Sequence, residues 1–338
     1  MGDQRRNVSM QDIAREAGVS SQTVSRVSNG SDSVRLATRD MVLAVMDRLG
    51  YRPNFAARAL KRGRFKAIGV AMFDIVATGN LLTLEGITKA ASDLDYAVTI
   101  TMMGKGQQRS LAAVVERMKN LPVDGVIVIL EQMLPDVGTF VPPAGMEVLL
   151  VSSAQSTTMS TIDEDQYGCS TMVTNYFLDR GHRTVHFVSG PEESLDSHFR
   201  EQGWIDALAR RGVVAPPVIR GDWSADSGFN AGLELAHVKD CTAVYAANDN
   251  EAYGVMQGLA AAGKRVPDDV SVIGVDDVLR NLIPRLTLTS VKMNFGAVGR
   301  RAFRMVARAI EDPQRSRPTR ELIPGVLVER SSVRDLTR

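Results

Sequence analysis

Three apolar runs of the chain end in polar side chains that could bind a small ligand. They end at Ser189-Gly190-Pro191, Asn248-Asp249 and Asp276-Asp277, and Arg200 follows the first of them. Carboxylates, an amide and a guanidinium offer the donors and acceptors that sugar hydroxyls need, and such a pocket discriminates against ligands that leave it unpaired. Any one of these clusters is better explained as turn chemistry, because Asn and Asp are common turn residues. Three of them at successive strand ends favour a binding site.

A tryptophan in a polar stretch adds an aromatic face to these groups. Trp223 stands in residues 221–229, GDWSADSGF, which we interpret as a loop. A flat indole stacks well on the C–H face of a sugar ring, whereas a half-buried structural Trp is the more common case. The residue types alone leave both explanations open.

The sequence shows no pattern typical of catalysis or metal binding. Its four histidines lack metal-ligand spacing, and there is no P-loop, nucleophile elbow or dinucleotide fingerprint. Asp276 and Asp277 could suggest glycoside hydrolysis, but neighbours on a strand point to opposite faces. We therefore expect no catalytic residues, no metal and no cofactor.

Residues 9–29, SMQDIAREAGVSSQTVSRVSN, have the spacing of two short helices joined by a glycine turn. Ser9 can cap the first helix with Asp12 as its capping-box partner, and Gly18 can end it. Ser20 can cap the second helix, which Gly30 ends. The apolar positions of the first helix are Met10, Ile13, Ala14 and Ala17. This pattern is typical of a helix-turn-helix, although an ordinary α-hairpin has the same spacing.

The second of these helices would present Ser21, Gln22 and Arg26 outward. Gln can bind adenine and Arg can bind guanine bidentately in the major groove. The charge agrees, because residues 1–64 carry 12 Lys and Arg against 6 Asp and Glu, whereas the rest of the chain is mildly acidic. This asymmetry indicates a nucleic-acid-binding end, although a solvated basic helix pair would show it too.

A third helix is predicted at residues 37–49, and a short basic helix at residues 53–63, PNFAARALKRG. The short helix is below the length at which isolated helices are stable in water. Its Leu60 has no local core to join. The alternative for this stretch is a basic linker.

The composition is that of a soluble globular protein. With 338 residues, 44% hydrophobic and 23% charged, the chain has room for two to three domains. No apolar run is long enough to span a membrane, and no signal-peptide core follows the first residues. Cys169 and Cys241 form neither a metal nor a disulfide pattern. We expect a cytoplasmic protein that does not contact a membrane.

From residue 66 onward, strand-like apolar runs alternate with helical periodicity. This alternation predicts an α/β fold of parallel sheets covered by helices on both faces. The expected strands are residues 66–73, 97–103, 124–130, 147–152, 184–190, 242–249 and 271–277, and the expected helices are 81–93, 111–120, 168–180, 198–211, 251–262 and 295–311. Two such halves would hold a ligand in a crevice beyond the carboxyl ends of the strands.

The motif AREAGVSSQTVSRVSNG, followed by LGYRPN at residues 49–54, resembles the lactose repressor/galactose repressor family of bacterial transcriptional regulators. The match is specific at the amino end, and a weaker one covers nearly the whole chain. The resemblance implies a three-helix helix-turn-helix domain at residues 1–52, a hinge helix at 53–64, and a two-lobed, periplasmic-binding-protein-like domain for effector binding and dimerisation at 65–338. It further implies a sugar-responsive repressor that binds a palindromic double-stranded DNA operator as a homodimer and is released by a small sugar.

The same resemblance implies which residues contact DNA. They are Ser21, Gln22, Thr23, Ser25, Arg26, Asn29, Arg35, Asn54, Ala57 and Leu60. In the family, the Leu that matches Leu60 wedges between base pairs in the minor groove. The chain departs from the family at Arg35, where a Ser cap is usual. We therefore expect an altered start of the third helix or a phosphate contact from Arg35.

The stretch GDWSADSGF resembles family members whose matching Trp packs on a sugar inducer. The implied effector-binding residues are Asp163, Asp196, Arg200, Trp223, Asn248, Asp276 and Met293. Asp163 rests on a loose local match, Asp196 replaces an expected Ser, and Met293 replaces an expected Gln. We expect a neutral, galactoside-like sugar. No leucine heptads precede residue 338, which favours a dimer over a tetramer. The alternative function is a cytoplasmic sugar-binding or sugar-processing protein without gene regulation.

Overall fold

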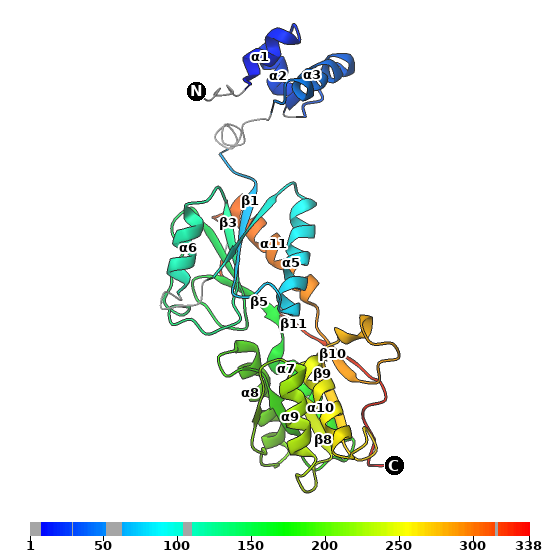
Figure 1. The fold of residues 1–338 in the computed structure, drawn as a ribbon. Coiled ribbons are helices and arrows are strands. Elements are labelled where there is room, and N and C mark those ends of the chain that lie inside the picture. The colour runs from blue at the N-terminus through cyan, green and yellow to red at the C-terminus, as the bar shows by residue number, and fades with distance from the viewer. Residues whose placement is uncertain (1–7, 29, 52–62, 104–109, 315–316) are drawn as a thin grey trace, which may run out of the picture. The chain divides into compact units, whose positions relative to one another are not determined.

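The computed structural model describes residues 8–28, 30–51, 63–103, 110–314 and 317–338. These residues belong to two compact units, Met1–Phe65 and Lys66–Arg338 (Figure 1). The predicted hinge helix at residues 53–64 lies almost entirely outside the described residues.

The first unit consists, in its described part, of helices α1 (Met10–Glu16), α2 (Ser21–Ser28) and α3 (Leu36–Arg48). The predicted capping box is present, since Ser9 N–H donates to Asp12 Oδ2 at 3.0 Å and Asp12 N–H donates to Ser9 Oγ at 3.3 Å. Gly18 ends α1 with φ +63°, a conformation that favours glycine. The small core of the unit comprises Ile13, Ala14, Ala17, Val24, Val27, Val42, Val45 and Met46.

The second unit contains two six-stranded sheets, one in each of two lobes. The first sheet has the order β2-β1-β3-β4-β5-β11, and the second has the equivalent order β7-β6-β8-β9-β10-β12. The paired strands run parallel except β10 and β12, which are antiparallel. The chain passes between the lobes after β5, after β10 and after β11.

The first lobe contains β1 (Ala67–Met72), α5 (Thr78–Ser92), β2 (Ala97–Met102), α6 (Leu111–Lys119), β3 (Gly125–Ile129), β4 (Glu147–Val151), β5 (Ser160–Glu164), α11 (Phe295–Glu311) and β11 (Arg320–Ile323). Figure 1 shows α6 on one side of its sheet and α5 with α11 on the other. Along β1, Ile68, Val70 and Met72 join the core beneath α5 and α11, whereas Ala67 and Ala71 join the core beneath α6. This alternation buries both faces of the sheet.

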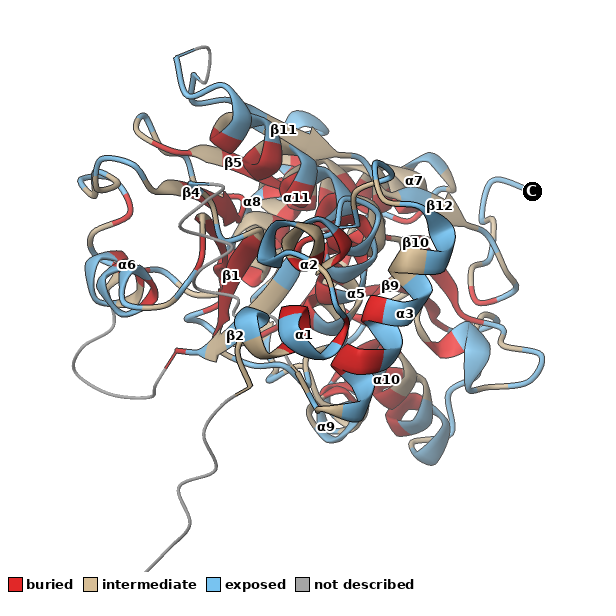
Figure 2. Cartoon of the chain, turned by 90° about the horizontal axis from the view of Figure 1, so that it is seen from above, coloured by how far each residue is buried: buried red, intermediate tan, exposed pale blue. Residues whose placement is uncertain are grey.

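The second lobe contains α7 (Gln166–Asp179), β6 (His186–Ser189), α8 (Leu195–Arg210), β7 (Ile219–Arg220), α9 (Ala225–Leu235), β8 (Ala243–Ala246), α10 (Asp249–Ala261), β9 (Ser271–Asp276), the short 3₁₀ helix η1 (Leu279–Asn281), β10 (Thr289–Lys292) and β12 (Val326–Val328). Its core centres on Phe187, which packs against Trp204 and Tyr245. In Figure 2, helices such as α3 and α10 change between buried and exposed along each turn, as amphipathic helices do.

The α/β architecture expected from the sequence is confirmed, but the sequence analysis does not predict seven of the described elements. Strands β5, β7, β10, β11 and β12 are short, and β5 ends in two carboxylates that interrupt its apolar pattern. The interpretation of residues 221–229 as a loop is wrong from Ala225 onward, where α9 begins. Gly228 of α9 lies in the predicted loop, yet a Cβ there would lie 2.2 Å from the backbone oxygen of Glu251 in α10. The glycine therefore allows two helices to pack closely.

Candidate functional site

Helix α2 presents an exposed polar face. Ser21, Gln22 and Arg26 are exposed, while Val24 and Val27 on the opposite side are buried in the three-helix core. Ser20 caps the helix through the N–H of Thr23 at 3.1 Å. Packing and capping thus fix the helix, and the side chains expected to read bases remain available at its surface.

The other predicted DNA-contacting residues are placed unevenly. Thr23 and Ser25 are half-buried, and the Thr23 hydroxyl lies 3.0 Å from that of Ser20. Arg35 is exposed at the N-cap of α3, which begins at Leu36, and its side chain makes no capping hydrogen bond. The remaining predicted contacts lie outside the described residues. They are Asn29, Asn54, Ala57 and Leu60.

A second group of polar and charged side chains, with one tryptophan, lies where the two lobes meet, and we call it the inter-lobe cluster. Its members are Asp163, Glu164, Gln166, Asp196, Arg200, Trp223, Asn248, Glu251 and Asp276. The lobes touch beside it, because Leu195 N–H donates to the Glu131 carbonyl at 2.9 Å. The strand ends that carry these residues therefore converge, as expected for the carboxyl ends of parallel strands.

Arg200 of α8 is the hub of the cluster and is only 3% exposed. Its Nε donates to Gln166 Oε1 at 2.8 Å, and its guanidinium also donates to the Ala247 carbonyl. Its Nη2 lies 3.5 Å from Asp276 Oδ1. A buried guanidinium with one carboxylate partner and two carbonyl acceptors is held in one orientation.

Trp223 is half-buried beside this guanidinium, with 5.7 Å between the Arg200 Cζ and the ring centroid. Its φ of +72° is unusual for a bulky residue and costs on the order of 1–3 kcal/mol. Glu251 Oε1 accepts from its N–H at 2.9 Å, and Asn248 Nδ2 donates to its carbonyl at 3.0 Å. A Cβ on Gly190 would lie 2.3 Å from the indole. Strain held by several partners is typical of a functional site.

Asn248 has a structural role, which is the alternative to ligand binding that applies to the polar residues at the strand ends. Its Oδ1 caps α10 by accepting from Glu251 N–H at 2.7 Å, while its Nδ2 holds Trp223. Asn248 therefore positions the indole, and its contact with a ligand stays a prediction. Glu251 is fully buried, and burial raises its pKa to about 8.

Asp276 and Asp277 point to different partners, as the strand geometry predicted. Asp276 faces Arg200, whereas Asp277 pairs with Arg330 at 2.6 Å. Both have positive φ, +102° and +53°. The two carboxylates therefore do not form a hydrolytic pair.

Three more carboxyl groups complete the cluster. Ser153 Oγ donates to Asp163 Oδ2 at 2.6 Å, and burial raises the pKa of Asp163. Burial and the charge of Asp163 raise the pKa of Asp196 to about 8. The same two causes raise the pKa of Glu164 well above its usual value. Because Asp163 belongs to the first lobe and Asp196 to the second, these carboxyl groups interact across the lobes.

Met293 belongs to the hydrophobic core of the second lobe against which Trp223 packs. It is 4% exposed in the core of the second lobe, where its sulfur would lie 2.9 Å from a Cβ on Gly325. Sequence reasoning missed Gln166, Glu164 and Glu251. The spacing of Asn248 and Glu251 was a usable signal, since a cap residue and a carboxylate three positions later are typical of a helix start.

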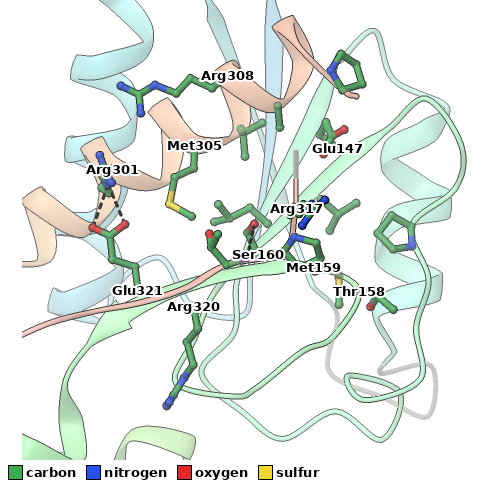
Figure 3. Close-up of a pocket in the computed structure, with 18 of the residues that line it drawn as sticks. Glu147, Thr158, Met159, Ser160, Arg301, Met305, Arg308, Arg317, Arg320 and Glu321 are labelled. Atoms are coloured by element: carbon green, nitrogen blue, oxygen red, sulfur yellow. Dashed lines mark hydrogen bonds and ion pairs between the residues drawn. The ribbon is translucent and has the colours of Figure 1, made fainter. Parts of the chain in front are cut away.

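A cavity of about 660 Å³ lies elsewhere in the first lobe, between α11, β4 and the segment leading into β11 (Figure 3). Its apolar lining includes Val148, Leu149 and Met305. Arg301 at its rim is paired with both carboxylate oxygens of Glu321, at 3.0 and 2.9 Å. Among the described residues that line it, none is aromatic and none is a predicted effector contact. We therefore do not assign the effector to this cavity.

Within the described ranges, no helix is long and apolar enough to cross a membrane. The same ranges contain no group of three or more His, Cys, Asp or Glu side chains arranged to hold a metal ion.

Comparison with known proteins places these features in context. Residues 9–54 match the family model "Bacterial regulatory proteins, lacI family", and residues 174–333 match "Periplasmic binding protein-like domain". Catabolite control protein A of Priestia megaterium is 31% identical over 89% of this chain and 92% of its own length. The crystal structure of the Lac repressor dimer bound to operator and the anti-inducer ONPF matches with a TM-score of 0.82 and 26% identity, over 97% of this chain and 99% of that chain. The CelR–cellobiose complex matches with a TM-score of 0.70 and 27% identity, over 96% and 100% of the two chains.

Proposed function

Because this chain belongs to the lacI family of bacterial regulatory proteins, we propose that it is a DNA-binding transcriptional repressor whose operator affinity is controlled by a small sugar. The observation that carries the proposal is the exposed polar face of α2 in the same chain as the inter-lobe cluster. A sugar-binding protein without gene regulation would have no use for such a face. The operator and anti-inducer in the similar Lac repressor structure, and the cellobiose in the similar CelR structure, support both halves of the proposal.

The DNA-reading half rests on α2 and the segment after α3. Gln22 and Arg26 contact base edges, and Arg35 contacts phosphate. The segment at residues 53–64 acts as the hinge to the second unit, with Leu60 inserted into the minor groove. This division into residues 1–52, 53–64 and 65–338 follows from the family resemblance.

The protein acts as a homodimer on a palindromic site, because helix-turn-helix proteins of this kind read two half-sites by two-fold symmetry. Exposed apolar side chains support a subunit contact on the first lobe. Leu81 of α5 is 51% exposed, and Ile100 and Met102 of the edge strand β2 are 43% and 40% exposed. Apolar side chains gathered at a sheet edge are commonly covered by a partner.

The effector site is the inter-lobe cluster, with Trp223 stacked on the sugar and Arg200, Asp276 and Asn248 bound to its hydroxyls. The ligand favours one arrangement of the lobes, and the hinge transmits that preference to DNA. By linkage, operator and effector weaken each other's binding by the same factor. This function needs no catalytic residue, and we place the protein in the cytoplasm beside its operator.

The test begins with the full chain and a pool of random duplex DNA, from which the preferred site is selected. Affinity for that site is then measured with and without a panel of neutral and amino mono- and disaccharides. We expect binding about 10³-fold tighter than to random DNA and a loss of about 5- to 150-fold with at least one sugar. Absence of a preferred site would overturn the repressor assignment. A preferred site that no sugar affects would overturn the sugar control.

A further inference from the structure

We propose that the effector carries a protonated amine, as an amino sugar does, and that its ammonium group lies between Asp163 and Asp196. The inference rests on the proposed function, since it names the class of sugar for the same site. It differs from the neutral sugar that the sequence led us to expect. The reason is the balance of charge that the fold creates in the inter-lobe cluster.

The cluster contains five carboxyl groups and one cation. Asp163 and Glu164 come from β5, Asp196 from α8, Glu251 from α10 and Asp276 from β9. Arg200 is the cation, and Glu131, at the end of β3, adds a sixth negative group beside Asp196. Three of the five carboxyl residues, Asp163, Glu164 and Glu251, are at 5% exposure or less, and Asp196 and Asp276 are half-buried. An anionic ligand such as a sugar phosphate would be repelled here.

Arg200 is already committed to other partners. Its donors go to Gln166, to the Ala247 carbonyl and to Asp276. Asp276 therefore has its counter-charge, while Glu251 is occupied on one oxygen by the N–H of Trp223. In the described structure, Asp163, Glu164 and Asp196 form no ion pair of their own, although the charge of Arg200 lowers the pKa values of Asp163 and Asp196.

These three groups have open bonding capacity. Asp163 accepts a hydrogen bond from the Ser153 hydroxyl and shares another with the side chain of Glu164. Among the described residues, no donor is bonded to the carboxylate of Asp196, and Glu164 Oε1 is buried without a partner. Gln166 Nε2 and Ser197 Oγ, 1% exposed and next to these groups in the chain, are also buried without partners in the described structure. Buried polar atoms are normally satisfied, so open ones in one cluster point to a missing ligand.

A neutral sugar would meet these carboxyl groups in their protonated state and would form hydrogen bonds but no charge pair with them. A buried carboxylate without a cation is costly, so it takes up a proton until a cation arrives. The raised pKa values of Asp163, Glu164 and Asp196 agree with this state. An ammonium group has three donors and one positive charge. It can bridge Asp163 and Asp196 while the ring stacks on Trp223 and its hydroxyls meet Arg200 and Asp276.

The experiment compares matched sugars that differ at one substituent. The full chain is titrated calorimetrically at pH 7 with glucose, glucosamine and N-acetylglucosamine, then with galactose, galactosamine and N-acetylgalactosamine, and then with cellobiose and chitosan disaccharide. At least one free amine should bind about tenfold or more tightly than its hydroxyl and acetamide counterparts. Its binding should release protons, visible as a heat that changes with the ionisation enthalpy of the buffer.

Two variants give the inference a second readout. Asp196→Asn and Asp163→Asn should each lower affinity for the amine about tenfold or more and remove most of the proton release, with little loss for the hydroxyl counterpart. Asp226→Asn, a change at an exposed carboxylate of α9, is the matched control and should alter neither. Should every amine bind no more tightly than its hydroxyl counterpart, the inference is overturned. If a neutral sugar then still releases operator DNA, the proposed function survives that result.

Discussion

The exposed face of α2 and the inter-lobe cluster differ in how exposed their side chains are and in which residues hold them. On α2, Gln22 and Arg26 are exposed, and a local core of valines holds the helix that carries them. In the cluster, Arg200 and Glu251 are buried, and each is held by residues distant in the chain. The side chains that we propose to read DNA are thus exposed at the surface, whereas those that we propose to bind the effector support one another.

This difference has a consequence for substitutions. A change on the exposed face of α2 removes a contact with DNA and leaves the fold intact. A change in the cluster removes a ligand contact and also disturbs its neighbours, because contacting residues do not act independently. Each prediction below uses a matched pair of residues to separate the two kinds of effect.

Trp223→Ala should have the largest effect, because it removes both the aromatic surface and the neighbour of Arg200. We expect the response to effector to be lost while operator binding persists, giving a repressor that no longer releases. DNA binding with and without effector measures this. Trp204, fully buried with its Nε1 bonded to the Val185 carbonyl at 2.9 Å, is the control. Trp204→Phe should lower the unfolding temperature and keep the response, and full sensitivity in Trp223→Ala would contradict the assignment.

The neighbouring pair Asp276 and Asp277 tests whether the cluster binds ligand or only stabilises the lobe. Asp276→Asn should weaken effector binding by about 1.5–3 kcal/mol, since a charged acceptor is lost. Asp277→Asn should leave effector affinity nearly unchanged and reduce stability, because it breaks the pair with Arg330. Titration calorimetry and thermal unfolding of both variants give the comparison. Equal effects on binding would show that proximity alone, and not the contact with ligand, explains the result.

Arg26→Ala should act on DNA alone. We expect a loss of about 1–3 kcal/mol on the preferred site and a much smaller loss on random DNA, with an unchanged unfolding temperature. Arg35→Ala, at the exposed start of α3, should weaken both DNAs alike if it contacts phosphate. Fluorescence anisotropy with the two duplexes measures both variants. Equal losses on both DNAs for Arg26→Ala would assign it to phosphate instead.

The smallest expected effect is on stability as a function of pH. The pKa of Asp196 and of Glu251 is raised to about 8 in the folded chain, against about 4 in an unfolded one. Between these values the folded state holds protons that the unfolded state has lost, so stability falls as pH rises from about 4 to about 8. The unfolding temperature without ligand should therefore be several degrees lower at pH 8.5 than at pH 6. Asp196→Asn should flatten this slope, and an unchanged slope would mean that Asp196 carries none of it.

The sequence predicts a region well when the contacts that stabilise it join residues close together in the chain. The caps at Ser9 and Ser20 join residues three positions apart, and the end at Gly18 depends on the positive φ of that residue alone, so α1 and α2 could be predicted closely. The site residues Arg200, Trp223 and Asp276 were named from strand ends and from the family resemblance, and the structure brings them together.

The rest depends on contacts that no local pattern contains. The sequence of α9 does not predict a helix, because Gly228 and Gly232 lower its helix propensity. These glycines allow α10 to pack closely against α9, which only the three-dimensional structure shows. Strand β5 reads as polar because Asp163 and Glu164 face a cluster completed by the other lobe. The sequence alone does not show that the cluster holds more carboxyl groups than cations, because these groups come from separate elements of both lobes.

The central claim is that the inter-lobe cluster and the DNA-reading unit are coupled. The most direct test takes the sugar that binds most tightly and measures its affinity for the full chain, first free and then saturated with the selected operator duplex. The account predicts that operator weakens sugar binding by the same factor, about 5- to 150-fold, by which sugar weakens operator binding. An identical sugar affinity in the two titrations would contradict it.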